Sequence, residues 1–188
     1  MRVIAGEFRS RRLQSMPGAE VRPTPDRLRE TLFSILGAST EGAVFVDAYA
    51  GTGAVGIEAL SRGARQAIFM EKDRKAANLI QTNLASLGIE SRARVILGSA
   101  ALYLSSVRAD IVFLDPPYPK EREYQASLDA LGAAPLGLVI VQHSKRLELS
   151  GEYGALRRTR MVRQGDNALS FFRPIESASQ PAEVAEEA

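Results

Sequence analysis

The stretch Val46-Asp47-Ala48-Tyr49-Ala50-Gly51-Thr52-Gly53-Ala54-Val55-Gly56 decides the fold that we predict for this chain. It begins at the end of an apolar run, 43–46, that is typical of a buried strand, and it ends in residues that favour a helix. Between the two, Gly51 and Gly53 permit backbone angles and a close ligand approach that a Cβ would prevent. The helix that follows would present free N–H groups at its start. The pattern therefore predicts a turn that binds a ligand.

Asp47 narrows the class of that ligand. The spacing Gly51-x-Gly53-x-x-Gly56, with Glu71 at the end of the next apolar run, also fits the dinucleotide-binding fingerprint. A carboxylate just before the first glycine would repel a pyrophosphate, whereas it suits a ligand with a cationic ammonium group. S-adenosylmethionine has such a group, has a ribose for Glu71 and has no phosphate, so we favour it over a dinucleotide. A turn that serves only packing is the third alternative.

The composition excludes several classes of protein. At 188 residues, 45% of them hydrophobic, the chain fits one domain with one core. No apolar run is long enough to span a membrane and the N-terminus lacks the apolar core of a signal peptide, so we expect a soluble, cytoplasmic monomer. The absence of cysteine excludes disulfides, thiolate metal sites and cysteine nucleophiles. The lone His143 cannot form a zinc site, so we interpret it as a structural or rim histidine and predict no metal.

The distribution of charge is more informative than its sum, which is only +2. Arginine dominates the basic residues, and these are concentrated in residues 1–30 and 145–165, on either side of a nearly neutral middle. Arginine suits phosphates and base edges, so the pattern favours a nucleic-acid partner. An ordinary solvated surface would explain the same distribution, and the charges alone do not separate the two interpretations.

The order of elements predicts an α/β fold. Apolar strands alternate with amphipathic helices from residue 43 onward, which is typical of a doubly wound, mostly parallel sheet with helices on both faces. The predicted strands are 43–47, 67–71, 93–97, 110–114 and 137–142. Residues 155–163 and 168–173 flank a turn and predict a C-terminal antiparallel hairpin. Residues 2–14 predict a small β-hairpin extension with little apolar surface of its own.

The motif Asp115-Pro116-Pro117-Tyr118 follows the fourth predicted strand. Asp47 and Glu71 also end strands, and the carboxyl ends of parallel strands meet at one edge of a sheet. We therefore expect the three carboxylates to face one crevice.

This motif suits methyl transfer to an exocyclic amino group, whose lone pair is otherwise delocalised into the ring of the base. The Asp115 carboxylate and the Pro116 carbonyl, oriented by two successive fixed φ angles, could accept the two amino hydrogens and free the lone pair to attack a sulfonium methyl. Tyr118 offers a ring on which the base can stack. Because the nitrogen loses its proton after it becomes cationic, no strong general base is needed.

These residues resemble the S-adenosylmethionine-dependent amino-methyltransferases. The runs Arg22-Pro23-Thr24-Pro25-Asp26-Arg27-Leu28-Arg29-Glu30-Thr31-Leu32-Phe33, Gly56-Ile57-Glu58-Ala59-Leu60-Ser61-Arg62-Gly63-Ala64 and Gly165-Asp166-Asn167-Ala168-Leu169-Ser170-Phe171-Phe172 narrow the resemblance to the RsmD-type enzymes. The resemblance covers about residues 1–174. It implies the seven-stranded, Rossmann-like class I methyltransferase sheet, transfer to N2 of one guanine in 16S ribosomal RNA, free or within an assembling small subunit, and an N-terminal extension that helps to hold the RNA.

We divide the chain accordingly into the hairpin extension and connector (1–24), a methyltransferase domain (25–174) and a disordered acidic tail (175–188). The predicted catalytic residues are Asp115, Pro116, Pro117 and Tyr118. The predicted cofactor-binding residues are Asp47, Ala50, Gly51, Thr52, Gly53, Glu71, Lys72, Ser99 and Ala100. The predicted RNA-binding residues are Arg9, Arg11, Arg12 and Arg22, which we expect beside the mouth of the crevice.

Two positions depart from the family pattern, and several alternatives stay open. Ser99 stands where such enzymes often carry Asp or Asn toward the cofactor adenine, and Gln164 stands where a tyrosine is usual. A DNA or RNA adenine-N6 methyltransferase would use the same Asp-Pro-Pro-Tyr chemistry. An RNA-binding module with a vestigial pocket and a nicotinamide oxidoreductase are the remaining alternatives.

Overall fold

A computed structural model describes residues 1–15, 26–117, 121–133 and 137–175. Its helices are α1 (Asp26–Leu36), α2 (Ala54–Ser61), α3 (Arg74–Leu87), α4 (Ala100–Tyr103) and α5 (Glu121–Ala133), with short 3-10 turns η1 (Gly37–Thr40), η2 (Glu90–Arg92) and η3 (Leu104–Ser106). Its strands are β1 (Val44–Asp47), β2 (Gln66–Glu71), β3 (Ala93–Leu97), β4 (Ile111–Leu114), β5 (Leu138–Ser144), β6 (Glu152–Tyr153), β7 (Leu156–Gln164) and β8 (Asn167–Pro174).

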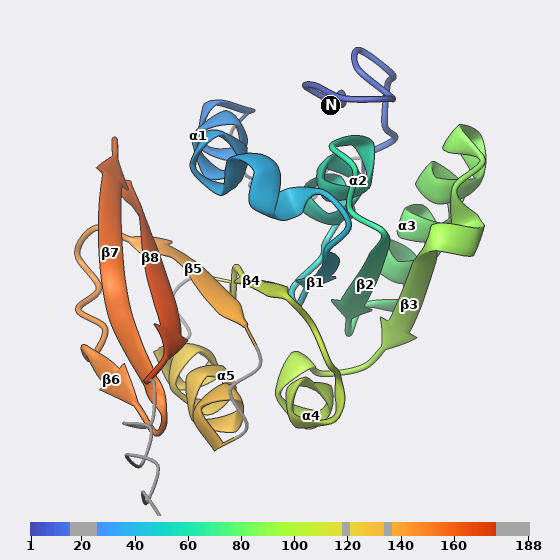
Figure 1. The fold of residues 1–188 in the computed structure, drawn as a ribbon. Coiled ribbons are helices and arrows are strands. Elements are labelled where there is room, and N and C mark those ends of the chain that lie inside the picture. Colours follow the sequence, from blue (N-terminus) through green and yellow to red (C-terminus); the bar gives the residue numbers. More distant parts are fainter. Residues whose placement is uncertain (16–25, 118–120, 134–136, 176–188) are drawn as a thin grey trace, which may run out of the picture.

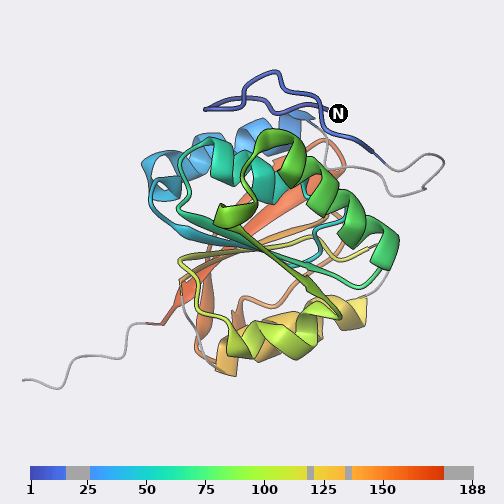
Figure 2. The same cartoon turned by 90° about the vertical axis from the view of Figure 1, so that its right-hand side faces the viewer.

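The strands form one sheet in the order β3-β2-β1-β4-β5-β8-β7-β6. Strands β1 to β5 are parallel to one another, whereas β8 is antiparallel to both β5 and β7. Helices α1, α2 and α3 cover one face of the sheet, and α4 and α5 cover the other (Figures 1 and 2). The predicted doubly wound α/β fold with its C-terminal antiparallel hairpin is confirmed. The described residues contain eight strands where seven were predicted, because the two-residue β6 adds an edge next to β7.

The buried side chains explain why the sheet is covered on both faces. Alternate residues of each central strand point to opposite faces, so a strand that is apolar throughout needs a helix on either side. In β4, for example, Ile111 and Phe113 pack in the cluster that contains α1 side chains, whereas Val112 and Leu114 pack in the cluster that contains α5 side chains. None of the helices in the described part of the chain is long and apolar enough to cross a membrane.

The N-terminal segment (residues 1–14) folds back on itself and packs on α2 and α3 rather than extending from the domain (Figure 2). An antiparallel bridge joins Arg2 to Arg12, so the segment is hairpin-like without regular strands. Val3 and Leu13 are only 1% and 5% exposed and belong to one core cluster with side chains of α2 and α3. The expectation that this segment has little apolar surface is therefore wrong, because it buries two apolar side chains. Burial of each such side chain contributes about 1.5–3 kcal/mol to stability.

Polar contacts from α2 fix the same segment. The carboxylate of Glu58, which is fully buried, accepts hydrogen bonds from the N–H groups of Ile4 (2.8 Å) and Ala5 (3.0 Å). Glu58 is also ion-paired with Arg62 (2.8 Å) and lies 3.8 Å from the buried guanidinium of Arg29 in α1. A buried carboxylate is retained where it is paired and hydrogen-bonded, and Glu58 is both.

Candidate active site

The three predicted carboxylates lie at the edge of the sheet where the parallel strands end, which we call the carboxyl edge. Asp47 is the last residue of β1, Glu71 is the last residue of β2, and Asp115 directly follows β4. Strand β1 lies between β2 and β4, and Asp47 is paired in register with Phe69 of β2 and Phe113 of β4. The structure therefore brings these residues to one edge, as their positions at strand ends predicted.

Asp47 is buried beneath the first turn of α2. Its side chain is 1% exposed, and its Oδ2 accepts a hydrogen bond from the Gly56 N–H at 2.9 Å. Burial raises the pKa of Asp47 to about 7, the Gly56 hydrogen bond opposes this rise and the charge of Glu71 adds to it. The carboxylate thus anchors the helix start, and a cationic group nearby would favour its ionised form.

The glycine loop holds its shape through backbone contacts. Gly51 and Gly53 have φ values of 53° and 79°, in the left-handed region that other residues adopt with strain. The Ala50 N–H donates to the carbonyl of Met70 in β2 (3.0 Å), and the Gly53 N–H donates to the carbonyl of Ala50 (2.7 Å). A Cβ on Gly53 would lie 3.2 Å from the side chain of Ile80 in α3, a tight contact that adds to the strain of a positive φ at this position.

Glu71 is tied to the same loop. Its Oε2 accepts the Gly51 N–H and its Oε1 accepts the Asp73 N–H, both at 2.8 Å. These two bonds hold the carboxylate at the end of β2, where its remaining lone pairs could accept hydroxyl groups.

The remaining predicted cofactor-binding residues are Thr52 in the loop itself and Lys72, Ser99 and Ala100 outside it. The carbonyl of Thr52 accepts a hydrogen bond from the Asn83 amide in α3 (3.2 Å). Lys72 is ion-paired with Glu123 of α5 (3.4 Å), an exposed contact. Ser99 precedes α4 and its side chain makes no capping bond to that helix, while Ala100 is buried in the first turn of α4. Ser99 and Ala100 follow β3, which is paired in parallel with β2, so they also lie at the carboxyl edge.

The Pro116 carbonyl is held by a residue that sequence reasoning missed. Pro116 is buried, and its carbonyl accepts a hydrogen bond from the hydroxyl of Tyr124 at 3.2 Å. Tyr124 itself is 1% exposed, in the second turn of α5. The carbonyl keeps a second lone pair for another donor. Pro117 is exposed, and Tyr118 lies outside the described residues.

Two more contacts connect α5 with the loops of the site. The hydroxyl of Tyr49, in the loop after β1, lies 2.8 Å from the Ser127 hydroxyl, and Glu123 approaches Lys72 as described above. Burial raises the pKa of Tyr49, so its hydroxyl stays protonated near neutral pH. In the sequence, the helical spacing of Tyr124, Leu128 and Leu131 places Tyr124 on an apolar side of the helix and indicates no role for its hydroxyl.

Of the two predicted interpretations of His143, a structural or a rim residue, its burial fits the structural one. It is 1% exposed in β5, with Nε2 at 2.9 Å from the Ser170 hydroxyl of β8 and Nδ1 at 2.9 Å from the Ser144 carbonyl. Burial lowers the pKa of His143, so the neutral ring links the two strands.

Three of the four predicted RNA-binding arginines lie in the described part of the chain. Arg9, Arg11 and Arg12 are exposed, but Arg11 donates to the carbonyl of Ser86 in the last turn of α3 (3.1 Å). This turn leads into the beginning of β3, so Arg11 lies near the edge opposite the carboxyl edge. Arg22 lies outside the described residues.

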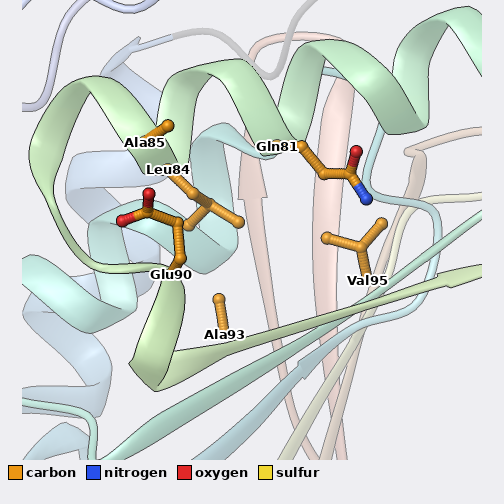
Figure 3. Close-up of a pocket in the computed structure, with 6 residues that line it drawn as sticks. All are labelled: Gln81, Leu84, Ala85, Glu90, Ala93 and Val95. Atoms are coloured by element: carbon orange, nitrogen blue, oxygen red, sulfur yellow. The ribbon is translucent and has the colours of Figure 1, made fainter.

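A shallow hollow elsewhere on the molecule is unrelated to these residues. Figure 3 shows it between the second half of α3 and the beginning of β3. It is lined by Gln81, Leu84, Ala85, Glu90, Ala93 and Val95. Because it includes the first residue of β3, it lies away from the carboxyl edge and brings none of the predicted site residues together.

A family model described as "Conserved hypothetical protein 95" matches residues 1–173. The chain belongs to this family. The Conserved hypothetical protein 95 match extends over the N-terminal segment, the candidate site and the C-terminal hairpin, which agrees with the resemblance to RsmD-type enzymes inferred from the sequence.

Named relatives and solved structures agree with the Conserved hypothetical protein 95 assignment. The chain is 34% identical over 182 residues to the "Putative rRNA methyltransferase YlbH" of Bacillus subtilis, covering 92% of this chain and 98% of that protein. It is 40% identical over 123 residues to the "Ribosomal RNA small subunit methyltransferase D" of Haemophilus influenzae, covering 63% of this chain and 64% of that protein. The structure titled "Putative methyltransferase yhhF from Escherichia coli" superposes with a TM-score of 0.81 at 29% identity, covering 93% and 97% of the two chains.

Proposed function

We propose that this chain transfers a methyl group from S-adenosylmethionine to the exocyclic N2 amino group of a guanine in small-subunit ribosomal RNA. Membership of the Conserved hypothetical protein 95 family, together with relatives named as ribosomal RNA methyltransferases, makes the chain a ribosomal RNA methyltransferase. The observation that carries transfer to an exocyclic amino group is the pair of acceptors beside the glycine loop, and the choice of guanine follows from the resemblance to the RsmD-type enzymes. Asp115 follows the strand next to β1, and the Pro116 carbonyl beside it is held by Tyr124.

The residues at the carboxyl edge fit the cofactor. Asp47 offers a buried carboxylate whose ionised form a cationic ammonium group would stabilise, and Glu71 offers a carboxylate already oriented by two backbone donors. The left-handed turn at Gly51 and Gly53 leaves the backbone open to close approach. When bound, S-adenosylmethionine supplies an electrophilic methyl group on a sulfonium.

The residues of the chain would make the amino group of the base nucleophilic. The Asp115 carboxylate and the Pro116 carbonyl would accept its two N–H hydrogens and hold the nitrogen in a pyramidal geometry. The lone pair would then be free to take the sulfonium methyl group, with the neutral thioether as the leaving group, and the cationic nitrogen would pass its proton to solvent water. Positioning and electrostatics supply this assistance.

Mass spectrometry of ribosomal RNA tests the proposal. RNA from a strain that lacks the gene should lose one N2-methylguanine from the small-subunit RNA, and the wild-type gene should restore it. The matched control is complementation with Asp115→Ala, which should restore nothing although the protein accumulates. Loss of N6-methyladenine in place of methylguanine would refute the guanine assignment and support the adenine alternative.

We also propose that arginines of the N-terminal segment contact the RNA backbone, together with Arg22 in the connector. Arg9, Arg11 and Arg12 are exposed on a segment that is hydrogen-bonded to α2 and packs on α2 and α3, and this exposure supports the proposal. Phosphate binding releases counterions, so removing one arginine–phosphate pair should lower the slope of log affinity against log salt by about 0.7–0.9. The measurement is RNA affinity of the quadruple Arg→Gln variant across a salt series. An unchanged slope would refute the assignment.

A further inference from the structure

An unpartnered carbonyl lies next to the predicted acceptor site. Within the described residues, the buried side-chain polar atoms without a hydrogen-bond partner belong to Arg29, Thr40, Gln142 and Gln164. Gln142 is 4% exposed in β5, and its Oε1 is the atom without a partner. A buried amide oxygen without a hydrogen-bond partner lowers the stability of the fold by about 1–3 kcal/mol, and most buried polar groups in native proteins have a partner. A ligand that donates a hydrogen bond to Oε1 would remove this cost.

The register of the sheet places Gln142 beside Asp115. Strands β4 and β5 are parallel and pair Leu114 with Val141, so the next residues of the two chains are Asp115 and Gln142. Neighbouring strands lie about 4.8 Å apart, which is within reach of two side chains that interact with the same base.

The two side chains also belong to the same face. Phe113 and Ile140 pack together in the cluster that contains α1 side chains, and Asp115 and Gln142 follow them by two residues. Because successive side chains alternate between faces, the residues two positions further along return to the face of Phe113 and Ile140. Asp47 lies two residues after Phe45 of the same cluster, so this face of the carboxyl edge carries Asp47, Asp115 and Gln142 on adjacent strands.

We infer that Gln142 determines the specificity for the acceptor base, with its Oε1 accepting the hydrogen bond from the N1–H of guanine. This inference rests on the proposed function, in which Asp115 and Pro116 accept the hydrogens of N2. N1 is the ring atom next to the carbon that carries N2, so one base edge can present N2 to Asp115 and N1–H to its neighbour. Adenine has no hydrogen on N1. A buried acceptor at this position favours guanine, because a site built around a hydrogen bond rejects a base that lacks the donor.

The test measures methyl transfer from S-adenosylmethionine to synthetic RNA that spans the guanine mapped by mass spectrometry. The same RNA is made with 2-aminopurine at that position, which keeps the exocyclic amino group and lacks the N1–H. Gln142→Leu removes the acceptor. Gln164→Leu is the matched control, because it removes the other unpartnered glutamine carbonyl, which lies at the end of β7 two strands away from β5. If Gln142→Leu fails to fold, the unbranched Gln142→Met takes its place.

We expect Gln142→Leu to lower kcat/KM for the guanine RNA by about 10- to 100-fold, the effect of leaving one buried donor unpaired. For the wild type, kcat/KM should be lower on 2-aminopurine RNA than on guanine RNA by a similar factor. On 2-aminopurine RNA, Gln142→Leu should have a kcat/KM less than about threefold below that of the wild type, because the same hydrogen bond is already missing. Affinity for S-adenosylmethionine should not change. Both leucine variants should raise Tm, since each removes a buried unpaired carbonyl, but Gln164→Leu should keep wild-type activity.

The outcomes separate this inference from the proposed function. Equal losses for Gln142→Leu on guanine and 2-aminopurine RNA, or an unchanged rate on guanine RNA, overturn the role of Gln142 while wild-type activity upholds the proposed function. A wild-type protein that methylates neither RNA overturns the proposed function, and the assignment of Gln142 with it.

Discussion

Replacing Asp47 by asparagine should remove a pH dependence that this one carboxylate gives to the stability of the fold. Asp47 is 1% exposed, and burial raises its pKa from 3.8 to about 7. Because the folded pKa lies above the unfolded value, the folded state binds more protons than the unfolded state between these pH values. The stability that the protonated group contributes is complete below about pH 4 and is lost as the pH rises through 7.

The magnitude follows from the interval between the two pKa values. Each pH unit in that interval changes the free energy of unfolding by about 1.4 kcal/mol. Between pH 5 and pH 8, ionisation of Asp47 should therefore lower the stability of the wild type by about 3 kcal/mol, chiefly below pH 7. Asparagine keeps an oxygen for the Gly56 N–H and has no charge to bury. The difference in free energy of unfolding should grow by the same amount in favour of Asp47→Asn.

Urea denaturation of both proteins without cofactor, followed by circular dichroism at one-unit pH steps, measures this difference. Comparison with the variant subtracts the titration of all other groups. Asp110→Asn is the matched control, because exposed Asp110 also accepts a backbone N–H, from Val44 at 2.8 Å. It replaces a carboxylate that the fold does not bury, and so measures the effect of exchanging Asp for Asn by itself. A difference for Asp47→Asn that stays within about 0.5 kcal/mol from pH 5 to 8 would refute a buried, protonated Asp47.

The remaining predictions concern the cofactor, the transfer step and the N-terminal segment. Glu71→Ala should weaken S-adenosylmethionine binding by about 1–3 kcal/mol in calorimetry, because it removes a charged acceptor, and tight binding of NAD instead would contradict the cofactor assignment. Asp115→Ala should lower the single-turnover rate by about two or more orders of magnitude and keep cofactor affinity, so a near-normal rate would contradict amino-group activation. Glu58→Ala should destabilise the fold by about 3–5 kcal/mol in urea, since it leaves Arg29 buried with less compensation, and a loss below about 1 kcal/mol would show that the buried pair is dispensable.

The sheet and the three carboxylates could be predicted from the sequence because their signals are local. An apolar strand that ends in Asp47 or Glu71 has a fixed direction once the sheet is parallel, and direction alone places both side chains at the carboxyl edge. The bounds of helix α3 also have local signals in the sequence, since Asp73 favours a helix start and Gly88 a helix end. In the structure, the Asp73 side chain accepts the Ala76 N–H at 2.8 Å and Gly88 ends the helix with a φ of 70°. Such capping residues act within one turn of the chain.

The parts that could not be predicted depend on contacts between distant residues. The N-terminal segment has only loosely alternating apolar residues, and its docking relies on Glu58 and Asn83, whose partners lie more than fifty positions away. Pairing of that kind leaves no periodic pattern in the sequence. Gln142 was counted as the end of an apolar strand, since nothing local distinguishes a satisfied glutamine from an unpartnered one.

The helix α5 explains how the site can hold its geometry before any ligand binds. Glu123, Tyr124 and Ser127 are spaced so that they lie on one side of the helix, and they contact Lys72, Pro116 and Tyr49 respectively. These partners follow β2, β4 and β1, so a single rigid element touches the loops of both the cofactor residues and the acceptor residues. Methyl transfer requires that the methyl group and the attacking nitrogen be positioned to within a few tenths of an ångström of their reactive geometry. Side chains fixed by packing on a helix supply that alignment better than loops that move independently.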